Sequence, residues 1–80
     1  MTASEAVQVR ILELCKARDL SINKLCTISG VTQSTVNNLM SGRNNSVTLS
    51  TIQKLCDGLD MDIADFFRCD LFHGLEQEIK

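Results

Sequence analysis

The chain has 80 residues, of which 44% are hydrophobic and 22% are charged, and its formal net charge is −2. These values predict one small folded domain and argue against a disordered chain. No apolar run approaches the roughly 18 residues of a membrane span, and the N-terminal region carries Glu5 and does not resemble a secretory signal, so we expect a cytoplasmic protein.

The absence of Pro and the scarcity of Gly favour helices joined by short turns, and hydrophobic spacing places five of them in the chain. The first is expected to run from Ser4, a candidate N-cap, to about Arg18. The second follows the N-cap candidate Ser21 and stops at Gly30. The positions expected to face the core are Val7, Ile11, Leu14 and Cys15 in the first helix, and Ile22, Leu25 and Cys26 in the second.

Hydroxyl and carboxylate side chains mark the starts of the other three helices. The predicted boundaries are Thr32 to Gly42, Thr48 to Gly58, and Asp62 onward. The inward positions are Val36, Leu39 and Met40, then Leu49, Ile52, Leu55 and Cys56, then Ile63, Phe66 and Phe67. Residues 47–52 also alternate as a strand would, but the length of the segment and its neighbours favour a helix. We therefore predict an all-α, compact five-helix domain over residues 1–69.

Residues 70–80 are predicted to form a short C-terminal tail, part of which could be helical. An apolar edge at helical spacing, interrupted by Gly74, consists of Leu71, Phe72, Leu75 and Ile79. Two interpretations stay open for this edge. Leu71 or Phe72 folds back on the core, or the edge pairs with its copy in a second subunit.

The four cysteines, Cys15, Cys26, Cys56 and Cys69, form no CxxC pair, and His73 is the only histidine. Cys15, Cys26 and Cys56 each follow a Leu in a helical pattern, and Cys69 lies two residues from Phe67 and Leu71. This pattern favours buried thiols over disulfides or a metal site. The sequence contains no Ser/His/Asp arrangement, Gly-rich phosphate loop or paired carboxylates. We therefore expect no catalysis, no catalytic residue, no metal, no cofactor and no small-molecule substrate.

The segment SGVT at residues 29–32 joins the second and third helices with the short, Gly-containing connection of a helix-turn-helix. The outer face of the third helix offers the amides and hydroxyl of Gln33, Ser34, Asn37 and Asn38. Asn and Gln can pair bidentately with adenine in the major groove, and Ser can donate to or accept from several base edges.

Charge is distributed unevenly along the chain. Residues 20–56 carry Lys24, Arg43 and Lys54 and no acid, whereas residues 57–80 carry seven acids against two basic residues. A surface built from the middle segment would accept a polyanion, and the C-terminal segment would repel one. Chance depletion of acids in a short chain stays open as the alternative.

Residues from about 7 to 67 resemble the Cro/C1-type helix-turn-helix family of phage repressors and bacterial regulators. The motifs that carry the resemblance are RILEL at 10–14, LSINKLC at 20–26, GVTQSTV at 30–36, LMSGR at 39–43, TLSTIQKLC at 48–56 and DIADFF at 62–67. The resemblance implies a lambda-repressor-like fold that binds double-stranded DNA, with a homodimer formed at least on DNA. It also supports buried thiols, because Cys26 and Cys56 stand where such domains usually place Ala.

The resemblance also implies roles for individual residues. The base-reading positions are Gln33, Ser34 and Asn38, with Asn37 between base and backbone reach. The positions implied for the DNA backbone are Ser21, Ile22, Asn23, Lys24, Thr35, Arg43, Asn44, Asn45, Ser46 and Thr48; Thr35 could instead meet a thymine methyl. The family often has Gln or Arg where Ile22 stands, so we expect a bond that braces the third helix or grips phosphate to be lost.

Two functions from different classes follow from the sequence. The first is a small transcriptional regulator that binds a specific duplex and reads the major groove with the third helix, at about residues 32–41. The second is a helical protein-interaction module that uses the same scaffold without specific DNA binding. A thiol redox sensor is a third hypothesis, and it requires an exposed, reactive cysteine.

Overall fold

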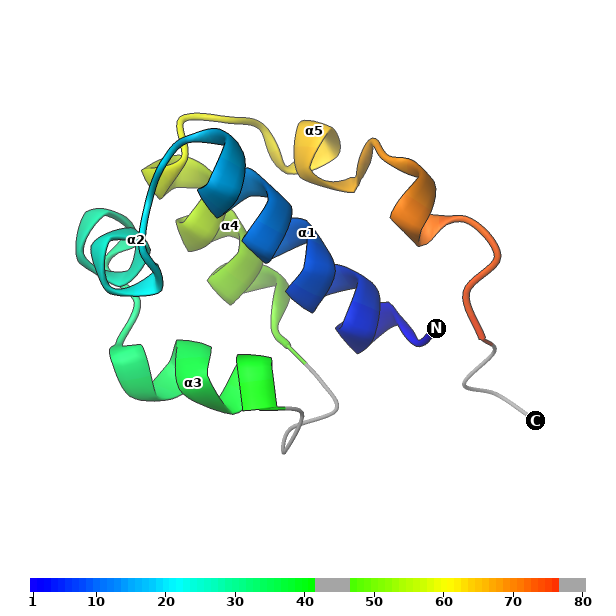
Figure 1. The fold of residues 1–80 in the computed structure, drawn as a ribbon, viewed down its shortest axis with the longest axis horizontal. Coiled ribbons are helices and arrows are strands. Elements are labelled where there is room, and N and C mark those ends of the chain that lie inside the picture. Colours follow the sequence, from blue (N-terminus) through cyan, green and yellow to red (C-terminus); the bar gives the residue numbers. More distant parts are fainter. Residues whose placement is uncertain (42–46, 77–80) are drawn as a thin grey trace.

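Helices follow one another along the chain in the computed structural model, which describes residues 1–41 and 47–76 (Figure 1). Their bounds are α1 Ala3–Ala17, α2 Ile22–Ser29, α3 Gln33–Ser41, α4 Leu49–Gly58 and α5 Ile63–Phe67, followed by a 3₁₀ turn, η1, at Asp70–Phe72. The described residues contain no strand, and the alternating segment 47–52 leads into α4. The predicted all-α, five-helix fold is therefore confirmed.

A hydrophobic core lies between the helices, and every one of the five contributes to it. The largest fully buried side chains are Ile11, Leu25, Val36, Leu55, Cys56 and Phe66. In Figure 1, α3 lies along the lower edge of the molecule and α5 along the upper edge, with α1 between them. The helical spacing of apolar residues thus predicted most of the core correctly.

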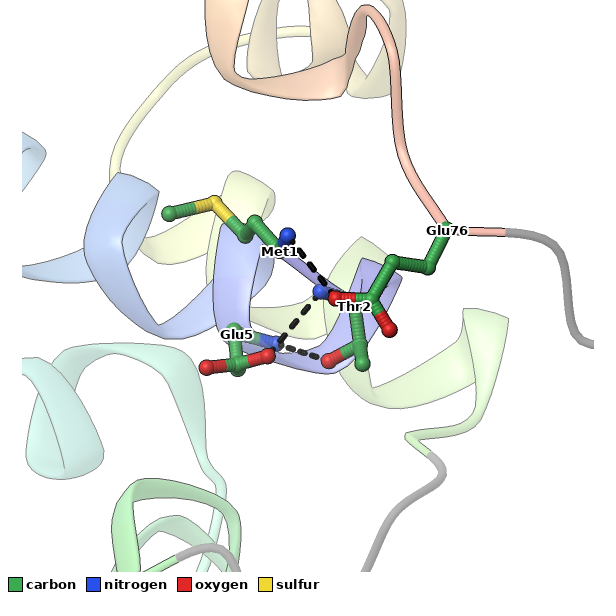
Figure 2. Close-up of polar contacts among 4 residues, drawn as sticks. All are labelled: Met1, Thr2, Glu5 and Glu76. Atoms are coloured by element: carbon green, nitrogen blue, oxygen red, sulfur yellow. Dashed lines mark hydrogen bonds and ion pairs between the residues drawn. The ribbon is translucent and has the colours of Figure 1, made fainter.

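The start of α1 differs from the prediction, because its N-cap is Thr2 and not Ser4. The Thr2 hydroxyl accepts from the Glu5 N–H at 3.2 Å, and the Glu5 carboxylate accepts from the Thr2 N–H at 3.0 Å, which completes a capping box (Figure 2). Only Thr2 has a carboxylate three residues later, whereas Ser4 is followed there by Val7. The hydrogen bonds from Thr2 lower the pKa of Glu5.

Leu49 was also predicted wrongly, because its side chain is 67% exposed and does not face the core. Thr48 is the N-cap of α4 and accepts from the Thr51 N–H at 3.2 Å, so Leu49 is the first residue of the helix. The buried face of α4 begins one turn later, at Ile52. The first turn of α4 therefore extends beyond the core, although Leu49 has the correct helical spacing.

The C-terminal ends of α2 and α4 approach each other closely at Ser29 and Gly58. A Cβ atom added at Gly58 would lie 2.8 Å from the Ser29 Cβ and 2.9 Å from its Cα. Gly58 therefore has a packing role, because only a residue without a side chain lets the two backbones come this close.

We expect Gly58→Ala to lower the free energy of unfolding by about 1–3 kcal/mol, because the added methyl forces α2 and α4 apart. The better helix propensity of Ala would offset at most about 1 kcal/mol of this. Urea unfolding followed by circular dichroism measures the effect. Ser50→Ala, on the exposed side of the same helix, is the matched control. Equal stability of the two variants would contradict the close approach.

The short helix α5 is attached to α1 by a side chain whose role the sequence did not reveal. The Arg10 guanidinium donates to the Phe66 carbonyl at 2.7 Å and to the Asp65 carbonyl at 2.9 Å. Its side chain is only 17% exposed. Arg10 thus bonds to two carbonyl oxygens near the end of a five-residue helix, where carbonyl groups lack partners within the helix. The Asp65 carbonyl also accepts from the Arg68 N–H, at 3.2 Å.

The tail folds back on the domain, as one of the two interpretations predicted. The ring of Phe72 packs against those of Phe67 and Phe66, with centroids 4.8 Å and 6.2 Å apart. The Glu76 N–H donates to the Met1 carbonyl at 3.1 Å. The Met1 amino group pairs with the Glu76 carboxylate at 3.1 Å (Figure 2). The described part of the tail is helical only in η1, and Ile79 lies outside the described residues.

None of the helices within residues 1–41 and 47–76 combines the length and the apolar character needed to cross a membrane.

Candidate nucleic-acid interface

The connection between α2 and α3 has the geometry of a helix-turn-helix. Gly30 ends α2 in the left-handed conformation, with φ of 71° and ψ of 18°, and its N–H donates to the Cys26 carbonyl at 3.0 Å. Val31 is buried and anchors the turn in the core. The Thr32 hydroxyl then accepts from the Thr35 N–H at 3.2 Å, as predicted for the residue that precedes α3. Three residues with distinct roles therefore turn the chain from one helix into the next.

The side chains of α3 separate into a buried face and an exposed face. Val36 and Leu39 are buried, and Met40 is half-buried. The exposed face carries the predicted base-reading residues Gln33, Ser34, Asn37 and Asn38. Their spacing of one, three and one residues aligns them in a single stripe along the helix. The fold therefore brings all four to one solvent-facing surface.

A hydrogen bond braces α3 against α2. We had expected such a bond to be absent, because Ile22 stands where the family often has Gln or Arg. The Gln33 side-chain N–H₂ donates to the Asn23 side-chain oxygen. Ile22 cannot form such a bond, but Asn23, the next residue in the first turn of α2, supplies the acceptor. The expectation was wrong because a carboxamide one position along the helix still reaches the start of α3. The bond uses one of the two N–H groups of Gln33.

The helix starts that were predicted to meet phosphate groups are capped by their own hydroxyls. The Ser21 hydroxyl accepts from the Lys24 N–H at 3.1 Å, and the Thr48 hydroxyl accepts from the Thr51 N–H. An anion at either helix start would therefore meet the other N-terminal amides, which lack partners within the helix. In Figure 1, α4 begins on the side of the molecule where α3 lies.

The remaining predicted backbone contacts differ in their surroundings. Lys24 is exposed in the first turn of α2, and Thr35 is exposed on α3, where its hydroxyl shares a 2.7 Å hydrogen bond with that of Thr32. Arg43, Asn44, Asn45 and Ser46 lie outside the described residues, as does Gly42.

A group of acidic residues lies on the opposite side of the molecule from α3. Four aspartates, Asp57, Asp60, Asp62 and Asp65, line a surface hollow with Met61 between the end of α4 and α5. Figure 1 shows this region along the upper edge and α3 along the lower edge. Within the described parts of the chain, no cluster of His, Cys, Asp and Glu could hold a metal ion. The negative potential of these carboxylates is therefore strongest away from the amide-bearing face of α3.

One contact to α3 was not predicted from the sequence. The Gln8 side chain of α1 donates to the Leu39 carbonyl at 2.8 Å, across 31 positions of the chain. Gln8 stands between two valines and belongs to no motif, and the acceptor is a backbone carbonyl that every residue possesses. No sequence signal could therefore have identified this pair.

The cysteines are unpaired. Cys15, Cys26 and Cys56 are buried as predicted, but the prediction is wrong for Cys69, which is partly exposed. Burial raises the pKa of Cys15 and Cys56. A raised pKa lowers the amount of reactive thiolate that these two cysteines form at neutral pH.

We expect a thiol reagent to label Cys69 in the folded protein well before the three buried cysteines, which react only when the core opens. Mass spectrometry of the labelled chain over time distinguishes the sites, and labelling in urea gives the unprotected rates. Fast labelling of Cys15, Cys26 or Cys56 under native conditions would contradict their burial and revive the redox-sensor hypothesis.

A capped helix pair joined by a glycine turn, with an amide-bearing second helix facing solvent, defines a helix-turn-helix DNA-binding domain. The sequence profile of the Cro/C1-type HTH DNA-binding domain matches residues 10–70, and the chain belongs to this family. It is also similar to a solved structure described as "Crystal structure of the prophage Lp1 protein 11". The two chains are 38% identical, the match covers 86% of this chain and 91% of the other, and the TM-score is 0.80. No curated protein sequence matches the chain.

Proposed function

We propose that the protein is a small transcriptional regulator that binds a specific double-stranded DNA sequence and reads the major groove with α3. The observation that carries the proposal is the exposed stripe of Gln33, Ser34, Asn37 and Asn38 on the second helix of a helix-turn-helix. Residues 20–56 contain no acid that would repel phosphate groups near this stripe.

The four residues of the stripe have different tasks in this proposal. Gln33 and Asn38 each offer a carboxamide that can pair with the N6 and N7 atoms of adenine. The bond to Asn23 limits the rotamers of Gln33 before DNA is bound, so less side-chain entropy is lost on binding. Ser34 contacts a base edge from the first turn of α3, and Asn37 reaches either a base or the backbone.

The backbone contacts come from the elements that flank α3. Ser21, Asn23 and Lys24 at the start of α2, Thr35 on α3 and Thr48 at the start of α4 are assigned this role, together with Arg43, Asn44, Asn45 and Ser46. Only three basic residues occur within residues 20–56. We therefore expect a salt slope on the order of −3 per monomer, for three phosphate contacts.

A homodimer on DNA is part of the proposal, because two-fold partners read two half-sites about one helical turn, roughly 34 Å, apart. Phe72 of the tail is already packed against Phe66 and Phe67 within its own chain. This contact favours a dimer surface outside Phe72. Residues 1–69 as the domain, residues 70–80 as its tail, and a cytoplasmic location stay predictions.

Selection of bound fragments from a random duplex pool tests the proposal most directly. We expect the full chain to enrich one sequence, with a palindrome if it binds as a dimer, and its binding should weaken as salt rises. A pool without enrichment, together with binding that does not respond to salt, would overturn the proposal in favour of a protein-interaction module.

A further inference from the structure

The hydrogen bond between Gln8 and Leu39 joins α1 to the last turn of α3. The donor is the Gln8 side-chain N–H₂, the acceptor is the Leu39 carbonyl, the distance is 2.8 Å, and the contact is partly buried. Leu39 lies two residues before the end of α3 at Ser41. The last four carbonyl groups of a helix have no N–H partner within the helix. Gln8 therefore supplies from α1 a partner for the C-terminal end of α3.

This bond has a counterpart at the opposite end of α3, where Gln33 donates to Asn23 of α2. Between these two points, α3 is held by the buried side chains of Val36 and Leu39. Apolar burial is non-directional and tolerates small rotations of a short helix, whereas a hydrogen bond depends on both distance and angle. The two carboxamide contacts therefore define the orientation of α3 more narrowly than its apolar face does.

We propose that Gln8 is a positioning residue for DNA recognition, which fixes the orientation of α3 before the protein meets a duplex. The inference rests on the proposed function, since orientation matters only if α3 reads bases. Base-edge contacts require a narrow range of positions. Non-specific binding is electrostatic, does not depend on the sequence, and even lets a protein slide along the duplex. Without the Gln8 contact, α3 would have to be ordered at the moment of specific binding, which lowers affinity for the specific duplex alone.

The test compares Gln8→Met with Thr2→Ala in the full chain. Met has nearly the length of Gln and a high helix propensity but cannot donate to the Leu39 carbonyl. Thr2→Ala removes the N-cap of the same helix, so it destabilises the protein without touching α3. Each variant is titrated with the duplex selected from the random pool and with a random duplex of equal length, and the ratio of the two affinities is the readout.

We expect Gln8→Met to lower this ratio about tenfold and Thr2→Ala to leave it unchanged. Hydrogen exchange of the α3 amides is measured in parallel, and Gln8→Met should accelerate exchange in α3 more than in α2 or α4. An unchanged ratio in Gln8→Met, or an equal fall in both variants, would overturn the positioning role, because the effect would then be absent or would follow stability alone.

The two proposals fail in different ways. If the wild-type chain prefers no duplex, base reading by α3 is wrong, and the positioning role for DNA recognition is overturned with it; the exchange measurement then shows only whether Gln8 holds α3 in place. If the wild-type chain prefers one duplex and Gln8→Met retains that preference, the proposed function stands and the role of Gln8 is rejected.

Discussion

Phe66→Ala should lower the free energy of unfolding by about 3–5 kcal/mol, the cost of emptying a fully buried aromatic site. Phe66 has no exposed surface, and its ring lies 5.1 Å from that of Phe67 and 6.2 Å from that of Phe72. A domain of this size has a total stability near the lower end of about 5–15 kcal/mol. We therefore expect the variant to be largely unfolded at physiological temperature.

Urea unfolding monitored by circular dichroism gives the change in stability. Leu49→Ala is the matched control, because it also truncates a large apolar side chain but at a position that is 67% exposed. Its effect should stay within about 0.5 kcal/mol. Similar losses in the two variants would contradict the full burial of Phe66.

The double substitution Gln33→Ala with Asn38→Ala should weaken binding to the selected duplex by about 2–6 kcal/mol, because each bidentate contact to a base contributes about 1–3 kcal/mol. Both side chains are exposed and Ala is a better helix former, so the fold should persist. Affinity for a random duplex should change little, since it depends on phosphate contacts.

Fluorescence anisotropy with both duplexes at several salt concentrations separates these effects. Gln53→Ala is the control, because it removes an exposed carboxamide from α4, where it bonds only to Asp57 of the same helix in the interactions described. Equal affinity of the double variant and the wild type for the selected duplex would show that α3 does not read bases through these two amides.

The parts of the fold that were predicted correctly are those determined by local chemistry. Ser21, Thr32 and Thr48 each accept a hydrogen bond from the backbone N–H three residues later, so a hydroxyl before an apolar run was a sufficient signal. The start of α1 was misplaced because two hydroxyl residues competed there. The position of Glu5 decided between them in favour of Thr2.

The parts that could not be predicted depend on the arrangement of helices in space. The period of α4 assigns Leu49 to the buried face, but it does not show where the core ends. Arg10 and Gln8 bond to backbone carbonyls that are between 31 and 56 positions away. Carbonyl groups are the same in every residue, so sequence patterns carry no information about such pairs.

In the candidate site too, features set by local sequence were predicted correctly, and a contact between helices was not. Helical periodicity was enough to predict that Gln33, Ser34, Asn37 and Asn38 face solvent, and the structure agrees. The hydrogen bond between Asn23 and Gln33 was missed, because the resemblance to the family suggested such a bond only for the neighbouring position, Ile22. Whether these side chains meet bases is a property of a complex, and it stays a prediction.

The four aspartates along the edge opposite α3 also contribute to the electric dipole moment of the molecule. Under the proposed function, a polyanion would exert a torque on such a dipole, so the molecule would turn its acidic edge away and present α3 during the approach itself. Much of the rotational search would then be complete before the first contact. At 0.1 M salt this alignment would act only within a Debye length of about 10 Å, so added salt would slow capture as well as weaken the contacts that follow.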